Sequence, residues 1–118
     1  KAAAETRALW AAGNEYLTKA QPWVHFKTDP VQAALGVRVG INLVRLCAIA
    51  AQPVIPDAAG KILSALGLEG AQGWPTGDAK TLLAALEPGQ SFTPAEILFA
   101  KIEDDQVAEW VERFGGAE

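Results

Sequence analysis

The chain has 118 residues, about the length of one ordinary domain. Half of its residues are hydrophobic and a fifth are charged, which is typical of a packed globular domain and not of a disordered tail. The net charge of −4 argues against a general cationic nucleic-acid binder, so we expect no DNA binding. One Cys and one His leave neither an internal disulfide nor a metal site built from these residues. Because the sequence contains no Met, we expect it to be part of a longer protein.

The hydrophobic runs are short. No run approaches the roughly 20 apolar residues that span a bilayer, and the stretch at residues 46–51 stops at Gln52-Pro53. Lys1 and Glu5 place charge at the start, which does not fit a signal peptide. We therefore expect no membrane partner.

Two helices are predicted in the first half. Residues 1–20 carry apolar side chains at three- and four-residue steps, and Pro22 ends this helix because it lacks an amide proton. Asp29 and Pro30 form a typical helix start, with Asp as the N-cap and Pro as the first helical residue. The second helix should run from Pro30 to about Gln52.

The second predicted helix is apolar almost all round. Arg38, Asn42 and Arg45 form one narrow polar stripe. Gly36 and Gly40 lie one turn apart and would let a neighbouring backbone come close. This pattern predicts the central helix of a bundle.

The second half predicts shorter elements. A third helix follows Pro56 and ends at Gly67 in a Schellman-type cap. Residues 69–78 should be a loop, a short helix should begin after Asp78 and end near Leu86, and residues 89–102 should be extended. The last helix should begin near Asp104. Its apolar positions are Val107, Trp110, Val111 and Phe114.

These elements predict an all-α fold, an antiparallel helix bundle with a C-terminal extension that ends in a helix. Charge divides unevenly along it. Residues 1–54 hold six basic and three acidic side chains, a net charge of +3, whereas residues 55–118 carry −7. An anionic ligand is therefore expected on the first half.

The sequence offers no catalytic constellation. His25 is the only histidine, and Cys47 lies on a helix predicted to be buried, where it fits a small core residue. The carboxylates of residues 103–105 fit a helix start. No phosphate-binding loop or dinucleotide fingerprint is present, so the chain by itself is expected to be non-catalytic.

The corner at Gln21-Pro22-Trp23 differs from the rest. A Trp held rigidly after a Pro can offer a flat face to an unpaired nucleobase, although a Trp near a helix end is more often a core residue or a hydrophobic staple. Both interpretations stand on the residues alone. The polar neighbours that would assist RNA binding are Lys19 and Lys27 toward phosphate, His25 as a hydrogen-bonding group and Asn14 toward a base edge.

The other three tryptophans are assigned structural roles. Trp10 and Trp110 lie on or beside apolar stripes and are expected in the core. Trp74, in a glycine-rich loop, is expected to plug that loop against the bundle.

Four segments, in this order, resemble the anticodon-binding helical domain of bacterial methionyl-tRNA synthetases. The first is the helix with Asn14 and Tyr16 that leads into Pro22-Trp23 and Lys27. The others are residues 52–62 (Gln-Pro-Val-Ile-Pro-Asp-Ala-Ala-Gly-Lys-Ile), the Leu66-Gly67-Leu68 ending with the later Trp74, and residues 97–103 (Ile-Leu-Phe-Ala-Lys-Ile-Glu).

The resemblance implies that Trp23 stacks on an anticodon base of tRNA, with Pro22 as its rigid neighbour. Other anticodon contacts in the family come from an Asn and an Arg on an earlier helix, so those roles are not given to Asn14 or Arg7. Ile97 and Ala100 stand where the family usually has Pro, a departure that concerns loop stiffness.

The class I signatures for ATP are absent from the sequence, so no cofactor is expected in this chain. The resemblance implies a catalytic domain upstream that uses ATP and Mg²⁺, and a cytoplasmic enzyme. Residues 1–86 would form the anticodon-binding bundle, with its first helices upstream, and residues 87–118 the linker and C-terminal helix. The alternative is a helical scaffold that binds protein and no RNA, favoured by the acidic second half.

Overall fold

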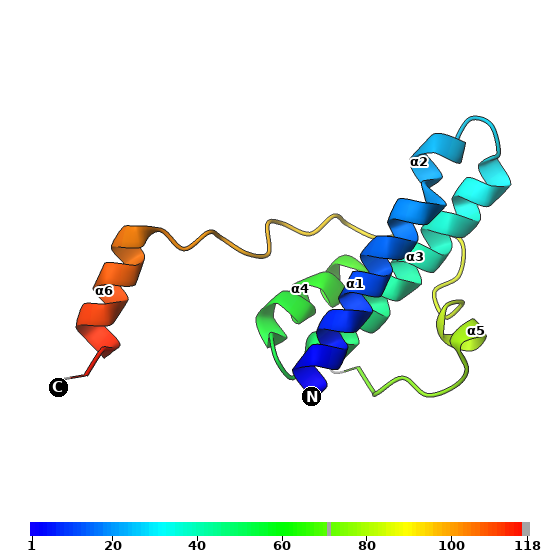
Figure 1. The fold of residues 1–118 in the computed structure, drawn as a ribbon. Helices are drawn as coiled ribbons and strands as arrows, with labels where there is room; N and C mark the ends of the chain where they lie inside the picture. Colours follow the sequence, from blue (N-terminus) through cyan, green and yellow to red (C-terminus); the bar gives the residue numbers. More distant parts are fainter. Residues whose placement is uncertain (71, 117–118) are drawn as a thin grey trace.

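A computed structural model describes residues 1–70 and 72–116. These residues form helices and connecting segments without a β-strand, which confirms the predicted all-α class (Figure 1). The helices are α1 (Ala2–Ala20), α2 (Pro22–His25), α3 (Pro30–Ala51), α4 (Pro56–Ala65), α5 (Ala79–Leu82) and α6 (Asp104–Phe114).

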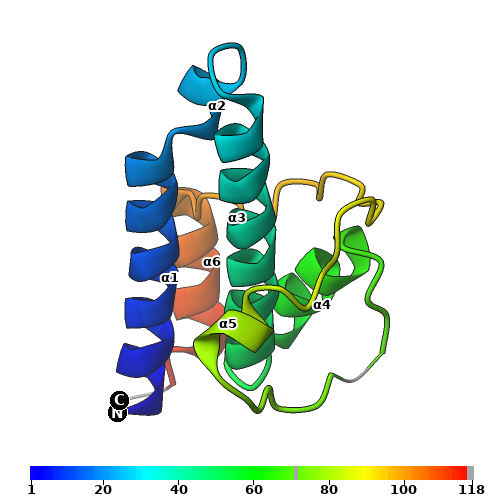
Figure 2. The same cartoon turned by 90° about the vertical axis from the view of Figure 1, so that its right-hand side faces the viewer.

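Helices α1 and α3 form an antiparallel pair joined by α2 (Figure 2). Helix α3 starts as predicted, because an Oδ1 atom of Asp29 accepts a hydrogen bond of 3.2 Å from the backbone N–H of Gln32 and Pro30 occupies the first turn. The pair sits close because Gly36 and Gly40 face α1. A Cβ added at Gly40 would lie 2.9 Å from Leu17 Cδ2, so the closeness predicted from the two glycines is confirmed.

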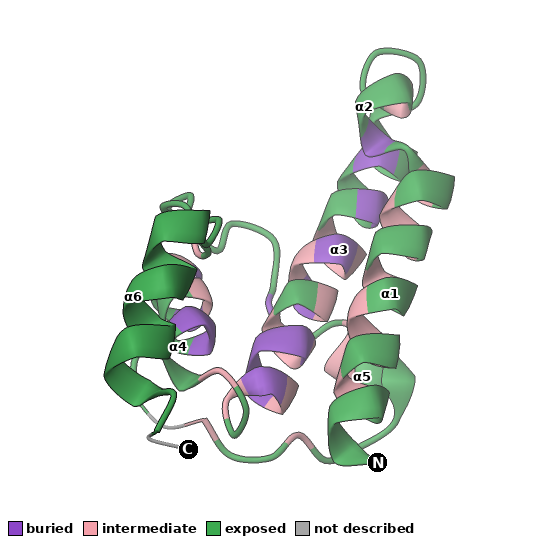
Figure 3. Ribbon diagram, turned by 60° about the vertical axis from the view of Figure 1, so that its left-hand side comes forward, coloured by how far each residue is buried: buried purple, intermediate pink, exposed green. Residues whose placement is uncertain are grey.

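The core lies where α3 meets α4. Ala48, Ile49 and Leu63 are almost fully buried there and form one apolar cluster (Figure 3). Helix α4 ends in the predicted Schellman cap, in which Gly67 has a φ of +73° and the N–H of Leu68 donates to the carbonyl of Leu63 at 2.9 Å. The burial of small apolar groups on α3 confirms its role as the central helix.

The C-terminal extension stands away from the bundle. Residues 94–103 contain no helix, and Leu98 among them still lines a cavity with α1 and α3. Beyond it the chain leaves the bundle (Figure 1), and every residue of α6 is exposed. The assignment of Trp110 to the core is therefore wrong, since Trp110 is 44% exposed and no residue of its helix is buried. Trp74 is 70% exposed, so the prediction that it plugs its loop is wrong as well.

Helix α3 corrects the expectation about membrane spans. It has 22 residues and a mean hydropathy of 1.6 in its most apolar window, long and apolar enough to cross a membrane by length and composition alone. The prediction failed because it counted only unbroken apolar runs, whereas the polar residues of α3 are spaced widely enough to leave the average high. Here α3 packs against α1, α2 and α4, and the central helix of a bundle meets the same criteria.

Candidate nucleic-acid interface

A left-handed residue makes the corner between α1 and α2. Gln21 has a φ of 42°, a backbone conformation that residues other than Gly seldom adopt. Its N–H donates to the carbonyl of Leu17 at 3.0 Å and closes α1, and its own carbonyl accepts from the N–H of Val24 at 2.9 Å and opens α2. Pro22 is buried beneath the corner, whereas Trp23 is 64% exposed. The core interpretation of Trp23 is therefore wrong, and the indole is exposed, as the interpretation with an unpaired base requires.

Trp23 lies at the edge of an open apolar groove of about 990 Å³. One side of the groove comes from α2 and the first half of α3, and the other side from residues 86–92. We call residues 84–93 the wall segment. The large apolar side chains along the groove include Trp23, Phe26, Val31, Leu35, Pro88 and Phe92.

The polar stripe of α3 holds the wall segment in place. Asn42 is fully buried, where its Nδ2 donates to the carbonyl of Leu86 at 3.2 Å and its Oδ1 accepts from the N–H of Leu86 at 2.8 Å. Arg38 Nη2 donates to the carbonyl of Ala84 at 3.3 Å. The third member of the stripe, Arg45, buries its Nη1 atom without a hydrogen-bond partner among the described residues.

The far end of the wall segment is tied to the end of α4. Gln90 Nε2 donates to the carbonyl of Leu66 at 3.1 Å, and the N–H of Thr93 donates to the carbonyl of Ala65 at 2.8 Å. Since both ends are bonded to helices, the groove has a fixed second side. The sequence showed the stripe on α3 but not its partner, because the paired groups are backbone atoms more than 40 residues away.

The candidate polar residues divide between two places. Lys27 and the half-buried His25 lie with Trp23 on the α2 turn. Lys19 is exposed and its Nζ bonds Glu15 at 2.6 Å, so part of its charge is already paired. Asn14 lines a separate cavity of about 280 Å³ beside Trp10, and the structure does not bring it to the groove.

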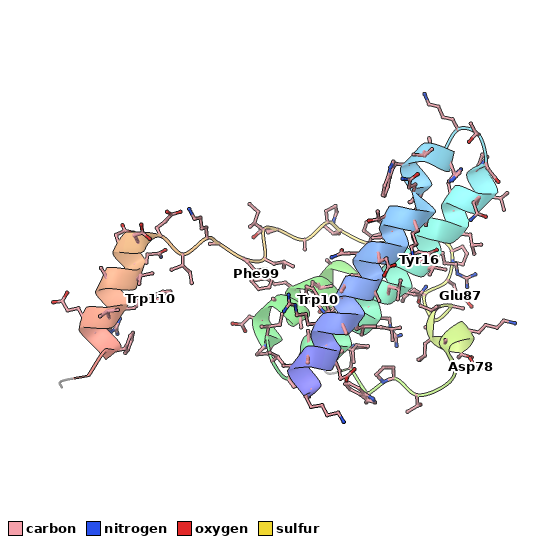
Figure 4. The ribbon with its side chains drawn as sticks, in the orientation of Figure 1. Trp10, Tyr16, Asp78, Glu87, Phe99 and Trp110 are labelled. Atoms are coloured by element: carbon pink, nitrogen blue, oxygen red, sulfur yellow. The ribbon has the colours of Figure 1, made fainter. Side chains whose placement is uncertain are left out.

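Cys47 takes the buried structural role predicted for it, whereas Trp10, expected in the core, is only half-buried. The Nε1 of Trp10 donates to the carbonyl of Cys47 at 3.2 Å, and Figure 4 contrasts this half-buried ring with Trp110 on the distant α6. Cys47 is buried, and burial raises the pKa of its thiol and keeps it protonated. Among the residues described, no three His, Cys, Asp or Glu side chains gather as metal ligands would.

Phe26 is the residue that the sequence analysis missed. It follows Trp23 by three positions, is 70% exposed and lines the same groove. Its signal was available, because residues three apart on a helix share a face.

An all-helical domain with an exposed aromatic corner and a groove beside it fits the class of helical RNA-binding domains. The chain belongs to one family of that class, since the family model for the anticodon binding domain of methionyl tRNA ligase matches residues 1–118. The resemblance noted in the sequence is thereby confirmed.

Proteins named methionine–tRNA ligase are similar to the chain over nearly all of its length. The one from Maricaulis maris is 63% identical over 99% of this chain, and the one from Hyphomonas neptunium is 58% identical over 98%. The one from Ruegeria sp. is 53% identical over 98%. The chain covers 21%, 21% and 20% of these relatives, so it spans about a fifth of their length. No solved structure matches the chain.

Proposed function

We propose that this chain binds the anticodon loop of tRNA as a domain of a methionine–tRNA ligase, the enzyme that attaches methionine to its tRNA with ATP. The family match over residues 1–118 supports the domain assignment, and the relatives' names support the ligase. In this proposal ATP and Mg²⁺ act in an upstream catalytic domain, which is also a partner of the chain. The ligase works in the cytoplasm.

The observation that carries the RNA-binding part is the exposed ring of Trp23. Unpaired bases of RNA are recognised by stacking on aromatic side chains. Trp23 offers such a face because buried Pro22 and the turn at Gln21 fix its backbone. Lys27 follows the same turn and is exposed, and we assign it a contact with phosphate, with weaker contributions from Lys19 and His25. The position of Asn14 beside the other cavity makes it the weakest candidate.

We also propose how the domain is divided. Residues 1–86 form part of the anticodon-binding bundle, whose first helices lie upstream, and residues 87–118 form the linker and C-terminal helix. Contacts from the upstream helices complete the site. Because the chain carries a net charge of −4, the 118 residues alone should bind tRNA weakly.

The test is Trp23→Ala in a ligase of the relatives' length that carries this chain. Stacking contributes about 1–3 kcal/mol per base, so the KM for tRNA should rise at least fivefold. Methionine-dependent exchange of pyrophosphate into ATP should stay unchanged, since it needs no tRNA. Trp74→Ala is the matched control, because Trp74 is equally exposed but lies outside the groove.

Unchanged tRNA charging by Trp23→Ala would contradict the stacking role. If the ligase bound no tRNA through this domain at all, the alternative of a helical scaffold for another protein would replace it. The exposed apolar face of α6 favours a contact with protein, which both functions allow.

A further inference from the structure

Phe26 has an exposure that a core role does not explain. It lies at the end of α2 with 70% of its surface exposed, and Trp23 one turn earlier is 64% exposed. Burying an aromatic ring of this size stabilises a fold by roughly 1.5–3 kcal/mol, so two adjacent exposed rings mark a surface that contacts something else.

The two rings share the groove described above. Both line it, and its opposite side is the wall segment, held to α3 by Asn42 and to the end of α4 by Gln90. The groove volume of about 990 Å³ is at the upper end for small-molecule pockets, so it has room for more than one base.

The charge beside the rings fits a polyanion. Lys27 directly follows Phe26 and is exposed, and the half of the chain that contains both rings is the basic one, with a net charge of +3. Stacking on successive aromatic rings beside a cation is how proteins hold consecutive unstacked nucleotides.

The geometry points to a second nucleotide subsite, in which Phe26 stacks on the anticodon-loop nucleotide next to the one that Trp23 holds. This inference rests on the proposed function and extends it from one base to two. Phe26 and Trp23 then form one two-ring surface, and the loop enters the groove with two adjacent bases turned out.

The experiment uses the ligase that carries this chain and a synthetic anticodon stem-loop of methionine tRNA. Phe26→Ala should weaken binding about tenfold. Phe26→Leu keeps the apolar bulk without the ring and should bind as weakly as Phe26→Ala. Phe26→Tyr keeps an aromatic ring and should bind as tightly as the unsubstituted ligase. Val24→Ala, on the same short helix but outside the groove, is the matched control. Thermal melting of each ligase variant followed by circular dichroism reports that the helical domain is folded, and pyrophosphate exchange reports that the catalytic domain is active.

Stem-loops with one abasic nucleotide locate the two subsites. One abasic position should cause no further loss of binding in Phe26→Ala, and another should cause no further loss in Trp23→Ala. These two positions should be neighbours in the anticodon loop. The inference fails if both variants become insensitive to the same nucleotide, or if Phe26→Leu restores binding, because then Phe26 only packs. Weak binding by Trp23→Ala with full binding by Phe26→Ala overturns the second subsite alone. Full binding by both variants overturns the proposed function too.

Discussion

Helices α3 and α6 have similar sequence patterns, but α3 is largely packed against other helices and α6 is exposed. Each has apolar residues at helical spacing and an acidic residue at its start. Yet α3 holds most of the buried residues that the structure describes, and α6 holds none. An apolar stripe indicates that a helix will pack on something, but it does not say on what.

What separates the two helices is the presence of specific partners. Gly36 and Gly40 admit α1, and Asn42 bonds the wall segment. The start of α6 is bonded locally, where the N–H of Glu103 donates to Gln106 Oε1 at 3.1 Å and Lys101 Nζ lies 3.9 Å from Glu103 Oε2. The apolar face of α6 is thus available to a surface outside this chain, and in the proposed ligase the catalytic domain is the neighbour that could provide it.

The strongest test of this contrast compares two substitutions, each of which shortens one apolar side chain to Ala. Leu63→Ala, in the core where α3 meets α4, should lower the free energy of unfolding of the 118-residue chain by about 2–5 kcal/mol. Trp110→Ala, on α6, should change it by less than about 0.5 kcal/mol. Urea unfolding followed by circular dichroism measures both. A comparable loss from Trp110→Ala would mean that α6 packs on the bundle in solution.

The next test removes a polar contact and leaves the apolar core intact. Asn42→Ala should lower the free energy of unfolding by about 1–3 kcal/mol, because the N–H and carbonyl of Leu86 lose their buried partner. Asn14→Ala, on exposed α1, is the control and should change little. Equal stability of the two variants would show that the wall segment holds without Asn42.

Removing the side chain that caps the start of a helix should give a smaller loss of stability, and again a larger one for α3 than for α6. Asp29→Ala should lower the free energy of unfolding by about 1 kcal/mol, because α3 loses its N-cap and α3 carries the core. Gln106→Ala should only fray α6, visible as faster amide exchange there with an unchanged unfolding midpoint. If Gln106→Ala also shifts the midpoint, α6 is part of the cooperative unit.

The smallest effect concerns α5 and pH. Hydrogen bonds from Thr81, first from its backbone N–H and then from its side chain, lower the pKa of Asp78 below its ordinary 3.8. A lowered pKa in the folded state means that the contribution is present above the ordinary value and is lost as pH falls through the folded one. The amide signal of Thr81 should titrate with a midpoint below 3.8, and Asp78→Asn should abolish this titration. A midpoint at 3.8 or above would contradict the contact.

The fold was largely predictable because the residues that begin and end its helices act through local hydrogen bonds. Asp29-Pro30, Gly67 and Pro22 fix helix ends through bonds within a few residues, and the structure has those ends. The wall segment and the exposure of Trp74 and Trp110 were not predictable, since they depend on which distant surfaces meet. For the site, the corner at Trp23 was found from sequence, whereas the groove needed the pairing of α3 with residues 84–86.

The turn at Gln21 has a consequence for how firmly the indole is aimed. A glycine there would relieve the left-handed conformation in the folded chain, yet it would enlarge the number of conformations open to the unfolded one. The two effects oppose each other, so Gln21→Gly should leave the melting temperature nearly where it was. With glycine at this position the direction of the indole would be less restrained. A ligand would then bind more weakly, because part of its binding free energy would offset the entropy lost when the ring is fixed.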